Sequence, residues 1–284
     1  MKWLKAIVDL VLYGNFWIAI CATSCAALTL ALSGENNLLS PVNFFVFGGT
    51  LFIYGVHRSV GILQLKNFLE EERYSVIYRY RNHIKTYAAL GLLVATISLY
   101  SLQPETWLAL IPLCILSLAY VIPFLQGSKR LRDIHYLKIF LIAICWMGLT
   151  AIIPLMELDV EFGPKQTWIC IDRFLFILLI TLPFDIRDLK VDSQNEVKTL
   201  PGQLGPNNTR ILGSIITLIL LGMTAMAFYH GWISLPVAGT FFSIYILALV
   251  LLFLATPDRH DYYYTGLVDG LMLALSLPII FVML

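Results

Sequence analysis

Long apolar runs constrain the fold of this chain more than any other feature. Each run holds about 20 residues, which as an α-helix is long enough to cross a hydrocarbon layer of about 30 Å. The nine runs lie at residues 11–32, 42–63, 86–102, 105–125, 138–156, 168–186, 210–230, 233–255 and 265–284. The sequence therefore predicts an all-α, polytopic membrane protein with nine transmembrane helices.

Composition agrees with this interpretation. Hydrophobic residues make up 59% of the chain, charged residues only 13%, and the mean hydropathy is +0.80, which is too apolar for an ordinary soluble domain. The first run lacks a small-residue cleavage site, so we expect it to remain as the first helix. No repeat or Gly/Ser-rich linker divides the chain, so we treat residues 1–284 as one domain. The five cysteines form no C-x-x-C pair and are interpreted as packing residues.

The basic residues are distributed unevenly between the two sides of the predicted bundle. With the N-terminus inside, 17 of the 19 Lys and Arg residues fall in inner segments, as the positive-inside rule requires. We therefore expect an integral membrane protein, in the inner or plasma membrane if the source is bacterial, with its N-terminus in the cytoplasm and its C-terminus outside. The inner connections 64–85, 126–138 and 187–209 carry most polar residues, so functional loops are expected to face the cytoplasm.

Three aspartates stand at the inner end of the sixth run. Asp185, Asp188 and Asp192 are offset by three and seven residues, which places all three carboxylates on one face of a helix. Carboxylates this close repel one another unless cations neutralise them, and hard oxygen ligands suit Mg²⁺ shared with a phosphate-bearing substrate. The alternative is a solvated helix end whose carboxylates pair with Arg187 and Lys190.

The segment downstream makes this motif more specific. Asp185 to Asp192, followed by Lys198-Thr199-Leu200-Pro201 and Leu204-Gly205, resembles the second aspartate-rich motif of the UbiA-type intramembrane prenyltransferases. The resemblance implies a helical bundle around a central cavity. It also implies an isoprenoid diphosphate donor held through Mg²⁺, a lipophilic acceptor and a surrounding bilayer, with no nucleic acid partner. In that family, ionisation of the donor gives an allylic cation that the acceptor attacks.

The resemblance assigns expected roles to further residues. Candidate diphosphate contacts are Arg187, Lys198, His57, Arg58, Lys129 and Arg130, and candidate cavity residues are Tyr54, Tyr120 and Asp269. Lys129 and Arg130 follow a tyrosine in an inner loop, as the basic loop of the family does, and anchoring at the inner membrane surface is the alternative for them. Asp269 stands among apolar residues, so it either faces a polar cavity or pairs with a basic residue.

The chain departs from the family at the inner end of the second run. There the family carries an Asn-Asp pair and further aspartates, whereas this chain has no acidic residue between Glu35 and Glu70. Three explanations remain open: His57 and Arg58 contact the diphosphate directly, an acidic residue of 70–72 folds back, or prenyl transfer has been lost and an isoprenoid-binding or scaffolding protein remains. We favour a prenyltransferase. A transporter is a third hypothesis, although carboxylates at a helix end lie away from the mid-depth of ion-coupling sites.

Overall fold

The computed structural model describes residues 2–35, 37–64, 72–123, 130–189, 192 and 198–283. Their secondary structure is helical throughout, with no strand in these ranges. The helices are α1 (Lys2–Tyr13), α2 (Phe16–Leu32), α3 (Pro41–Gln64), α4 (Glu72–Arg79), α5 (Arg81–Leu99), α6 (Pro104–Val121), η2 (Leu131–Asp133), α7 (Lys138–Met147), η3 (Gly148–Ile152), α8 (Ile153–Glu157), α9 (Pro164–Arg187), α11 (Leu200–Tyr229), α12 (Leu235–Leu254), η4 (Tyr263–Val268) and α13 (Asp269–Met283). The all-α prediction is confirmed. Residues Glu70, Glu71, Lys129 and Lys190 lie outside the described ranges.

The predicted apolar runs coincide with long helical segments, with α7, η3 and α8 together forming one of them and η4 with α13 another. Length and apolar composition qualify five of the described helices as membrane spans, or six if α1 and α2 count as one bent span. The predicted number of nine spans is therefore not confirmed. The bend of 53° between α1 and α2 falls at Asn15, which adopts a left-handed backbone conformation (φ 68°) that asparagine tolerates better than most residues.

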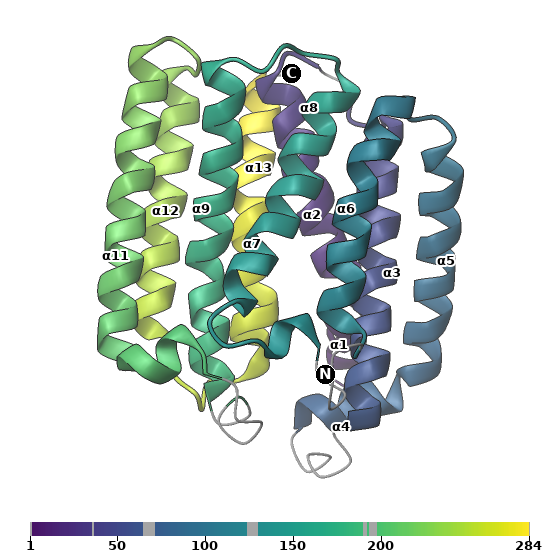
Figure 1. Cartoon of the computed structure of the whole chain (residues 1–284). Helices are drawn as coiled ribbons and strands as arrows, with labels where there is room; N and C mark the ends of the chain where they lie inside the picture. The colour runs from purple at the N-terminus through teal and green to yellow at the C-terminus, as the bar shows by residue number, and fades with distance from the viewer. Residues whose placement is uncertain are drawn as a thin grey trace.

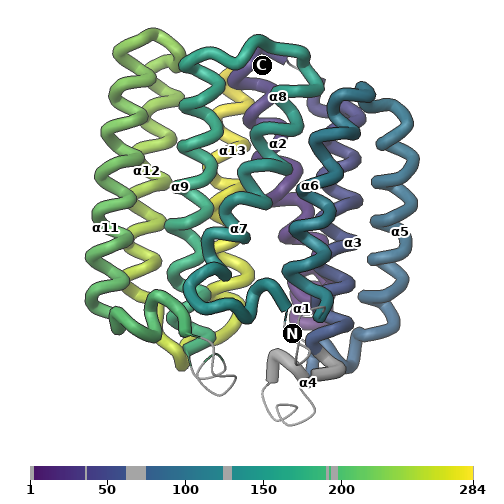
Figure 2. The backbone as a smooth tube through the Cα atoms, in the orientation of Figure 1, coloured from purple at the N-terminus to yellow at the C-terminus, as the bar shows by residue number. Residues whose placement is uncertain are grey.

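The long helices run roughly parallel to one another (Figures 1 and 2). On one side α3 packs against α5, and on the other α11 packs against α9 and α12. The first and last spans are neighbours, because α2 packs along α13, and Trp17 donates a hydrogen bond to the Gly266 carbonyl (3.1 Å). The two chain ends lie at opposite ends of the bundle.

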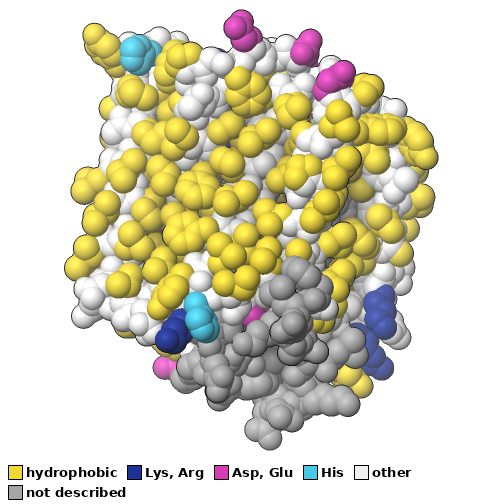
Figure 3. All heavy atoms as spheres, viewed as in Figure 1, with side chains coloured by type: hydrophobic (Ala, Val, Ile, Leu, Met, Phe, Trp, Pro, Cys, Tyr) yellow, Lys and Arg dark blue, Asp and Glu magenta, His cyan; other side chains and the backbone are white. Residues whose placement is uncertain are grey.

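The outer face of the bundle is apolar. Figure 3 shows hydrophobic side chains over the middle of one face, with charged groups gathered toward the two ends. Leu108 of α6 and Leu218 of α11 expose 70% and 68% of their surface, and many other large apolar residues are similarly exposed. A contiguous apolar surface of this extent requires a lipid environment. The chain is thus an integral membrane protein, while the side on which each terminus lies stays a prediction.

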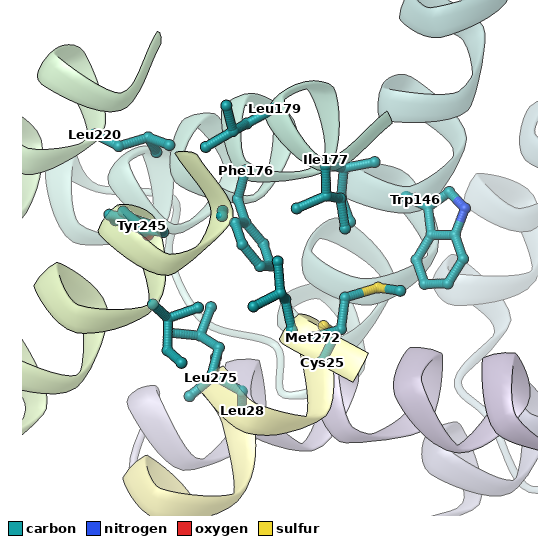
Figure 4. Packing of buried hydrophobic residues seen from close by; sticks show 14 of the residues in the cluster. Cys25, Leu28, Trp146, Phe176, Ile177, Leu179, Leu220, Tyr245, Met272 and Leu275 are labelled. Atoms are coloured by element: carbon teal, nitrogen blue, oxygen red, sulfur yellow. The ribbon is translucent and has the colours of Figure 1, made fainter. Parts of the chain in front are cut away.

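The core of the bundle lies between α2, α9, α12 and α13. Figure 4 shows Phe176 of α9 among residues of the three other helices, including Tyr245 and Met272. Asp172 of α9 accepts a hydrogen bond from the Tyr245 hydroxyl, so this buried carboxylate is not isolated. All five cysteines are free, and Cys25 is packed in this core as predicted.

A π-helical turn, η3, interrupts the span formed by α7 and α8. Pro154 has no N–H group to donate to the Thr150 carbonyl one turn earlier, so that oxygen lacks its usual helical partner. The Thr29 hydroxyl (2.7 Å) and Arg173 Nη1 (3.2 Å) donate to it instead. Arg173 is only 2% exposed, and it joins α9 to α2 and η3.

Candidate functional site: a cavity with one charged end

One cavity of about 640 Å³ lies between α3, α5, α6, α7, α9 and α13. Most of its wall is apolar and includes Phe45, Gly49, Leu92 and Leu110. Its charged end is formed by the ends of α3 and α9, by η2 and by the start of α7. The ionisable residues that line this end are His57, Arg58, Arg130, Arg132, Asp133, Lys138, Asp185, Arg187, Asp188, Asp192 and Asp261. A volume in this range is typical of small-molecule sites.

The three predicted aspartates converge on Lys138, the first residue of α7. Lys138 Nζ lies 2.8 Å from Asp185 Oδ1, 3.0 Å from Asp192 Oδ2 and 3.9 Å from Asp188 Oδ2. The ammonium group is buried, with 7% of the side chain exposed. The shared face expected from the offsets of three and seven residues is thus present, and a lysine ammonium lies at its centre.

Arg187 joins the end of α9 to the connection before η4. Its Nε lies 2.8 Å from Asp188 Oδ1, and its Nη1 lies 2.8 Å from Asp261 Oδ1. The guanidinium also lies over the rings of Phe184 (4.9 Å) and Tyr264 (5.3 Å). Arg187 lines the cavity as expected for a diphosphate contact, but two carboxylates already neutralise it.

On the opposite wall, His57 of α3 contacts Arg132 of η2. Arg132 Nη1 and His57 Nε2 are 2.6 Å apart, so His57 Nε2 must act as the acceptor and the ring is in its neutral Nδ1–H form. Arg132 also lies over the Tyr120 ring at 5.5 Å. Within the described part of the chain, no carboxylate oxygen pairs with Arg132 at 4.0 Å or less. This guanidinium is therefore the cation best placed to bind an anion in the cavity.

Arg58, a predicted diphosphate contact, also lines the charged end of the cavity. It donates hydrogen bonds to the Asn15 side chain and to the Leu12 carbonyl (3.4 Å), and it lies over the Tyr13 ring at 5.4 Å. These contacts join the end of α3 to the bend between α1 and α2. Arg58 is thus held in place by the bend while its side chain borders the cavity.

The other predicted basic contacts are placed differently. Arg130 lines the cavity but forms a two-pronged pair with Asp133, through Nε (3.1 Å) and Nη2 (3.0 Å). Burial opposes ionisation of Asp133, but the hydrogen bonds from Arg130 outweigh it and hold the pKa of that carboxyl below its usual value. Lys198 is exposed and is not part of the cavity wall; its backbone N–H donates to His135 Nδ1 (3.1 Å). Lys129 lies outside the described residues.

All three predicted cavity residues line the cavity. Tyr54 belongs to α3, Tyr120 to α6, and Asp269 begins α13. Asp269 has no hydrogen bond or ion pair with any residue that the structure describes. Its partly accessible carboxylate adds a further acidic group to the cavity wall.

The T-L-P segment that carried the resemblance forms a helix start. The Thr199 hydroxyl accepts a hydrogen bond from the Gly202 N–H (3.2 Å), which is an N-cap, and Pro201 occupies the first turn of α11, where no N–H is required. Gly205 then kinks α11 with a φ of 75°. Tyr136 N–H donates to the Lys198 carbonyl (2.9 Å), so this helix start anchors the loop between η2 and α7. The motif therefore helps to position Arg132 and Lys138.

The three aspartates, as arranged, do not fit a magnesium ion. Mg²⁺ binds oxygen atoms at about 2.0–2.1 Å in an octahedral shell, whereas Lys138 already bridges Asp185 and Asp192 from between them. Across the described ranges, no three or more His, Cys, Asp or Glu side chains are grouped so that they could hold a metal ion. Lys138 would have to leave this position before these carboxylates could share a divalent cation.

Sequence reasoning missed Lys138, Arg132 and Asp261 as site residues. Lys138 opens the run 138–156 and Arg132 lies two residues after Arg130, and in sequence both resemble basic residues that anchor the inner membrane surface. A lysine that opens an apolar run, beside an aspartate-rich helix end, was the available signal. Nothing in the local sequence around Asp261 indicates that it pairs with Arg187, which lies 74 residues away.

Several solved structures of other proteins have the same fold as this chain. A structure of digeranylgeranylglyceryl phosphate synthase matches with a TM-score of 0.61 and 13% identity over 99% of this chain and 98% of that chain. An apo UbiA homologue from Aeropyrum pernix K1 matches with a TM-score of 0.65 and 12% identity over 92% and 96%. A UbiA homologue from Archaeoglobus fulgidus, solved with GPP and Mg²⁺, matches with a TM-score of 0.58 and 13% identity over 96% and 99%.

Sequence comparison decides the family. No curated protein matches the chain. The model of the UbiA prenyltransferase family matches residues 80–275, which is more than half of the chain and includes the aspartate-rich segment, the T-L-P segment and the whole of α7. The resemblance noted from the motif alone is thereby confirmed, and the chain belongs to the UbiA prenyltransferase family.

Proposed function

We propose that this protein binds an isoprenoid diphosphate, with the diphosphate at the charged end of the cavity and the prenyl chain along the apolar walls, and transfers the prenyl group to a lipophilic acceptor. One observation carries the proposal: the same cavity changes from charged to apolar along α3. From His57 at the charged end to Phe45 near the other, the helix rises about 18 Å at 1.5 Å per residue. An amphiphilic ligand with an anionic head matches this gradient.

Arg132 is the main diphosphate contact in this proposal. Its guanidinium presents several N–H donors, has no carboxylate partner within 4.0 Å among the described residues, and lines the charged end of the cavity. Guanidinium groups bind phosphate oxygens through paired, charge-assisted hydrogen bonds. Arg58 adds positive charge on the same wall. Together they stabilise the negative charge that grows on the diphosphate as it leaves.

The reaction follows from this placement. The allylic C–O bond of the donor breaks with both electrons remaining on the diphosphate oxygen, which leaves an allylic cation in the apolar part of the cavity. A nucleophilic carbon or oxygen of the acceptor forms the new bond, and the acceptor then loses a proton to the released diphosphate. Tyr54 and Tyr120 line the cavity where the cation would form, and the apolar walls exclude water that would otherwise capture it.

The relatives support the ligand class. UbiA homologues from Archaeoglobus fulgidus have been solved with GPP and Mg²⁺ and with DMAPP and Mg²⁺. These show diphosphate and divalent-metal binding for those proteins. For this chain, the proposed ligand class is supported by the cavity described above. Use of Mg²⁺ at the three aspartates would require Lys138 to move away from them.

Binding without transfer is the second candidate. It is favoured by the substitution at the end of α3, where His57 and Arg58 stand in place of the family's aspartates. A site that retains the cavity and the cations but loses acidic groups on one wall would still hold a diphosphate. Such a protein would store, present or sense an isoprenoid lipid.

Diphosphate release separates the two candidates. The protein, purified in detergent and placed in lipid nanodiscs, is mixed with radiolabelled geranyl, farnesyl or geranylgeranyl diphosphate, and bound ligand is measured after filtration. Inorganic diphosphate is then measured after adding a bacterial membrane-lipid extract as the acceptor source. Binding followed by release supports transfer, whereas binding without release supports the second candidate. If none of the three diphosphates binds with or without Mg²⁺, both candidates are overturned.

A further inference from the structure

We infer that the Lys138 ammonium takes the position that a divalent cation would need between Asp185, Asp188 and Asp192, so that this site holds its diphosphate ligand without a metal ion. The first half of the inference concerns only the protein. The second half, on the ligand, rests on the proposed function. The geometry around Lys138 carries both.

The ammonium group is enclosed by the carboxylates rather than lying beside one of them. It makes close ion pairs with Asp185 (2.8 Å) and Asp192 (3.0 Å) and lies 3.9 Å from Asp188. All four side chains are largely buried, with between 3% and 17% exposed. Burying this many carboxylates requires a cation among them, and the chain supplies one covalently.

The position of Lys138 is fixed by the fold. It begins α7, which packs along α9, the helix that carries Asp185. The preceding loop is tied to the start of α11 through Tyr136 N–H and the Lys198 carbonyl (2.9 Å), and Lys198 N–H returns a hydrogen bond to His135. The lysine therefore enters the cluster from an anchored backbone, which makes its ammonium a resident group of the site.

A metal ion and this ammonium cannot occupy the cluster together. A Mg²⁺ ion bound to the oxygen atoms of Asp185 and Asp192 that contact Nζ would lie about 2.0–2.1 Å from those atoms, and therefore within about 5 Å of Nζ. Two cations at that distance repel each other strongly in a buried site. Metal binding at these aspartates must therefore expel Lys138, and removing Lys138 must expose a site for a metal.

The opposite wall of the cavity also carries basic groups of the protein. The α3 segment contains no Asp or Glu, so this helix could provide no carboxylate ligand for a second metal. It carries His57 and Arg58 instead, and His57 accepts a hydrogen bond from Arg132 (2.6 Å). Basic side chains thus lie on both walls of the cavity. Lys138 lies among the aspartates, and Arg58 and Arg132 lie on the opposite wall. Positive charge for a diphosphate is available without a metal.

Metal binding by the ligand-free protein tests the first half. Mn²⁺ replaces Mg²⁺ at oxygen sites and is counted from the loss of its free-ion signal in electron paramagnetic resonance. We expect the wild-type protein to bind no Mn²⁺ at this site, whereas Lys138→Met should bind about one ion. In the double variant Lys138→Met with Asp188→Asn, the affinity for this ion should fall by about tenfold or more. Lys138→Arg, which keeps the charge, should bind none. One Mn²⁺ per wild-type protein, lost in Asp188→Asn, would overturn the inference.

Diphosphate binding tests the second half and requires no variant. The affinity for geranyl diphosphate in EDTA should lie within about twofold of that in millimolar Mg²⁺. Binding that appears only with Mg²⁺ would overturn metal independence. If no diphosphate binds under either condition, the proposed function fails, and the Mn²⁺ count still decides the role of Lys138. The wild-type measurements also stand if Lys138→Met does not fold.

Discussion

Arg132 Nη1 lies 2.6 Å from His57 Nε2, across 75 residues of sequence. This contact explains how the chain accommodates the loss of aspartates at the end of α3. An acidic residue in place of His57 would pair with Arg132 and neutralise it, whereas a neutral imidazole orients the guanidinium and leaves its charge available. His57 therefore leaves Arg132, at the charged end of the cavity, without a carboxylate partner within 4.0 Å among the described residues.

Replacement of Arg132 should weaken diphosphate binding. We expect Arg132→Gln to lower the affinity for geranyl diphosphate by about 10- to 100-fold, the effect of losing one or two charge-assisted hydrogen bonds. Arg130→Gln is the matched control, because Arg130 already pairs with Asp133 through two nitrogen atoms, and it should change affinity by less than about threefold. Filter binding with labelled ligand measures both. Equal losses in the two variants would contradict the assignment of Arg132.

The Lys138 cluster should contribute to stability in a way that a double variant reveals. Lys138→Met leaves three buried carboxylates without their central cation and should lower the free energy of unfolding by about 3–5 kcal/mol. Adding Asp185→Asn should restore part of this loss, since one unpaired charge disappears. Lys198→Met, at an exposed lysine, should change stability by less than about 0.5 kcal/mol. Thermal unfolding in detergent measures the series, and additive losses in the double variant would argue against the cluster.

The length of the cavity should determine which prenyl chains fit. Gly49 lines its apolar part about 12 Å along α3 from His57, and a Cβ added there meets only Phe45, at 4.0 Å. Gly49→Leu should reduce binding of geranylgeranyl diphosphate by about tenfold or more while geranyl diphosphate changes little. Gly222→Leu, on the exposed side of α11, is the control. A parallel loss for both chain lengths would show that the prenyl chain does not follow this wall.

The π-helical turn predicts a coupling between Thr29 and Pro154. Thr29→Val removes a hydrogen bond to the Thr150 carbonyl (2.7 Å) and should cost about 1 kcal/mol of unfolding free energy. In a Pro154→Ala background the cost should shrink, because residue 154 regains an N–H for that carbonyl. Thr217→Val is the control, since its hydroxyl bonds only within its own helix, to Gly213 (2.8 Å). Thermal unfolding of the four variants measures the coupling, and an unchanged cost would refute it.

Much of the fold follows from local sequence. Apolar runs of about 20 residues predicted the positions of the long helices, and the T-L-P segment forms a helix start with a threonine cap. The offsets of Asp185, Asp188 and Asp192 predicted a shared carboxylate face. These inferences succeed because helix periodicity and capping depend on residues a few positions apart. The number of membrane spans did not follow with the same certainty, because several helices near the cavity carry polar residues that lower their hydropathy.

What neutralises the aspartates was decided only by the tertiary structure. Sequence indicated that three stacked carboxylates need a cation and, through the family resemblance, suggested Mg²⁺. The fold places Lys138 among them, although it lies 54 residues before Asp192 in the sequence. It also brings Arg132 into contact with His57. Ion pairing depends on distances between side chains on different helices, which the packing of α7 against α9 sets and no local pattern encodes.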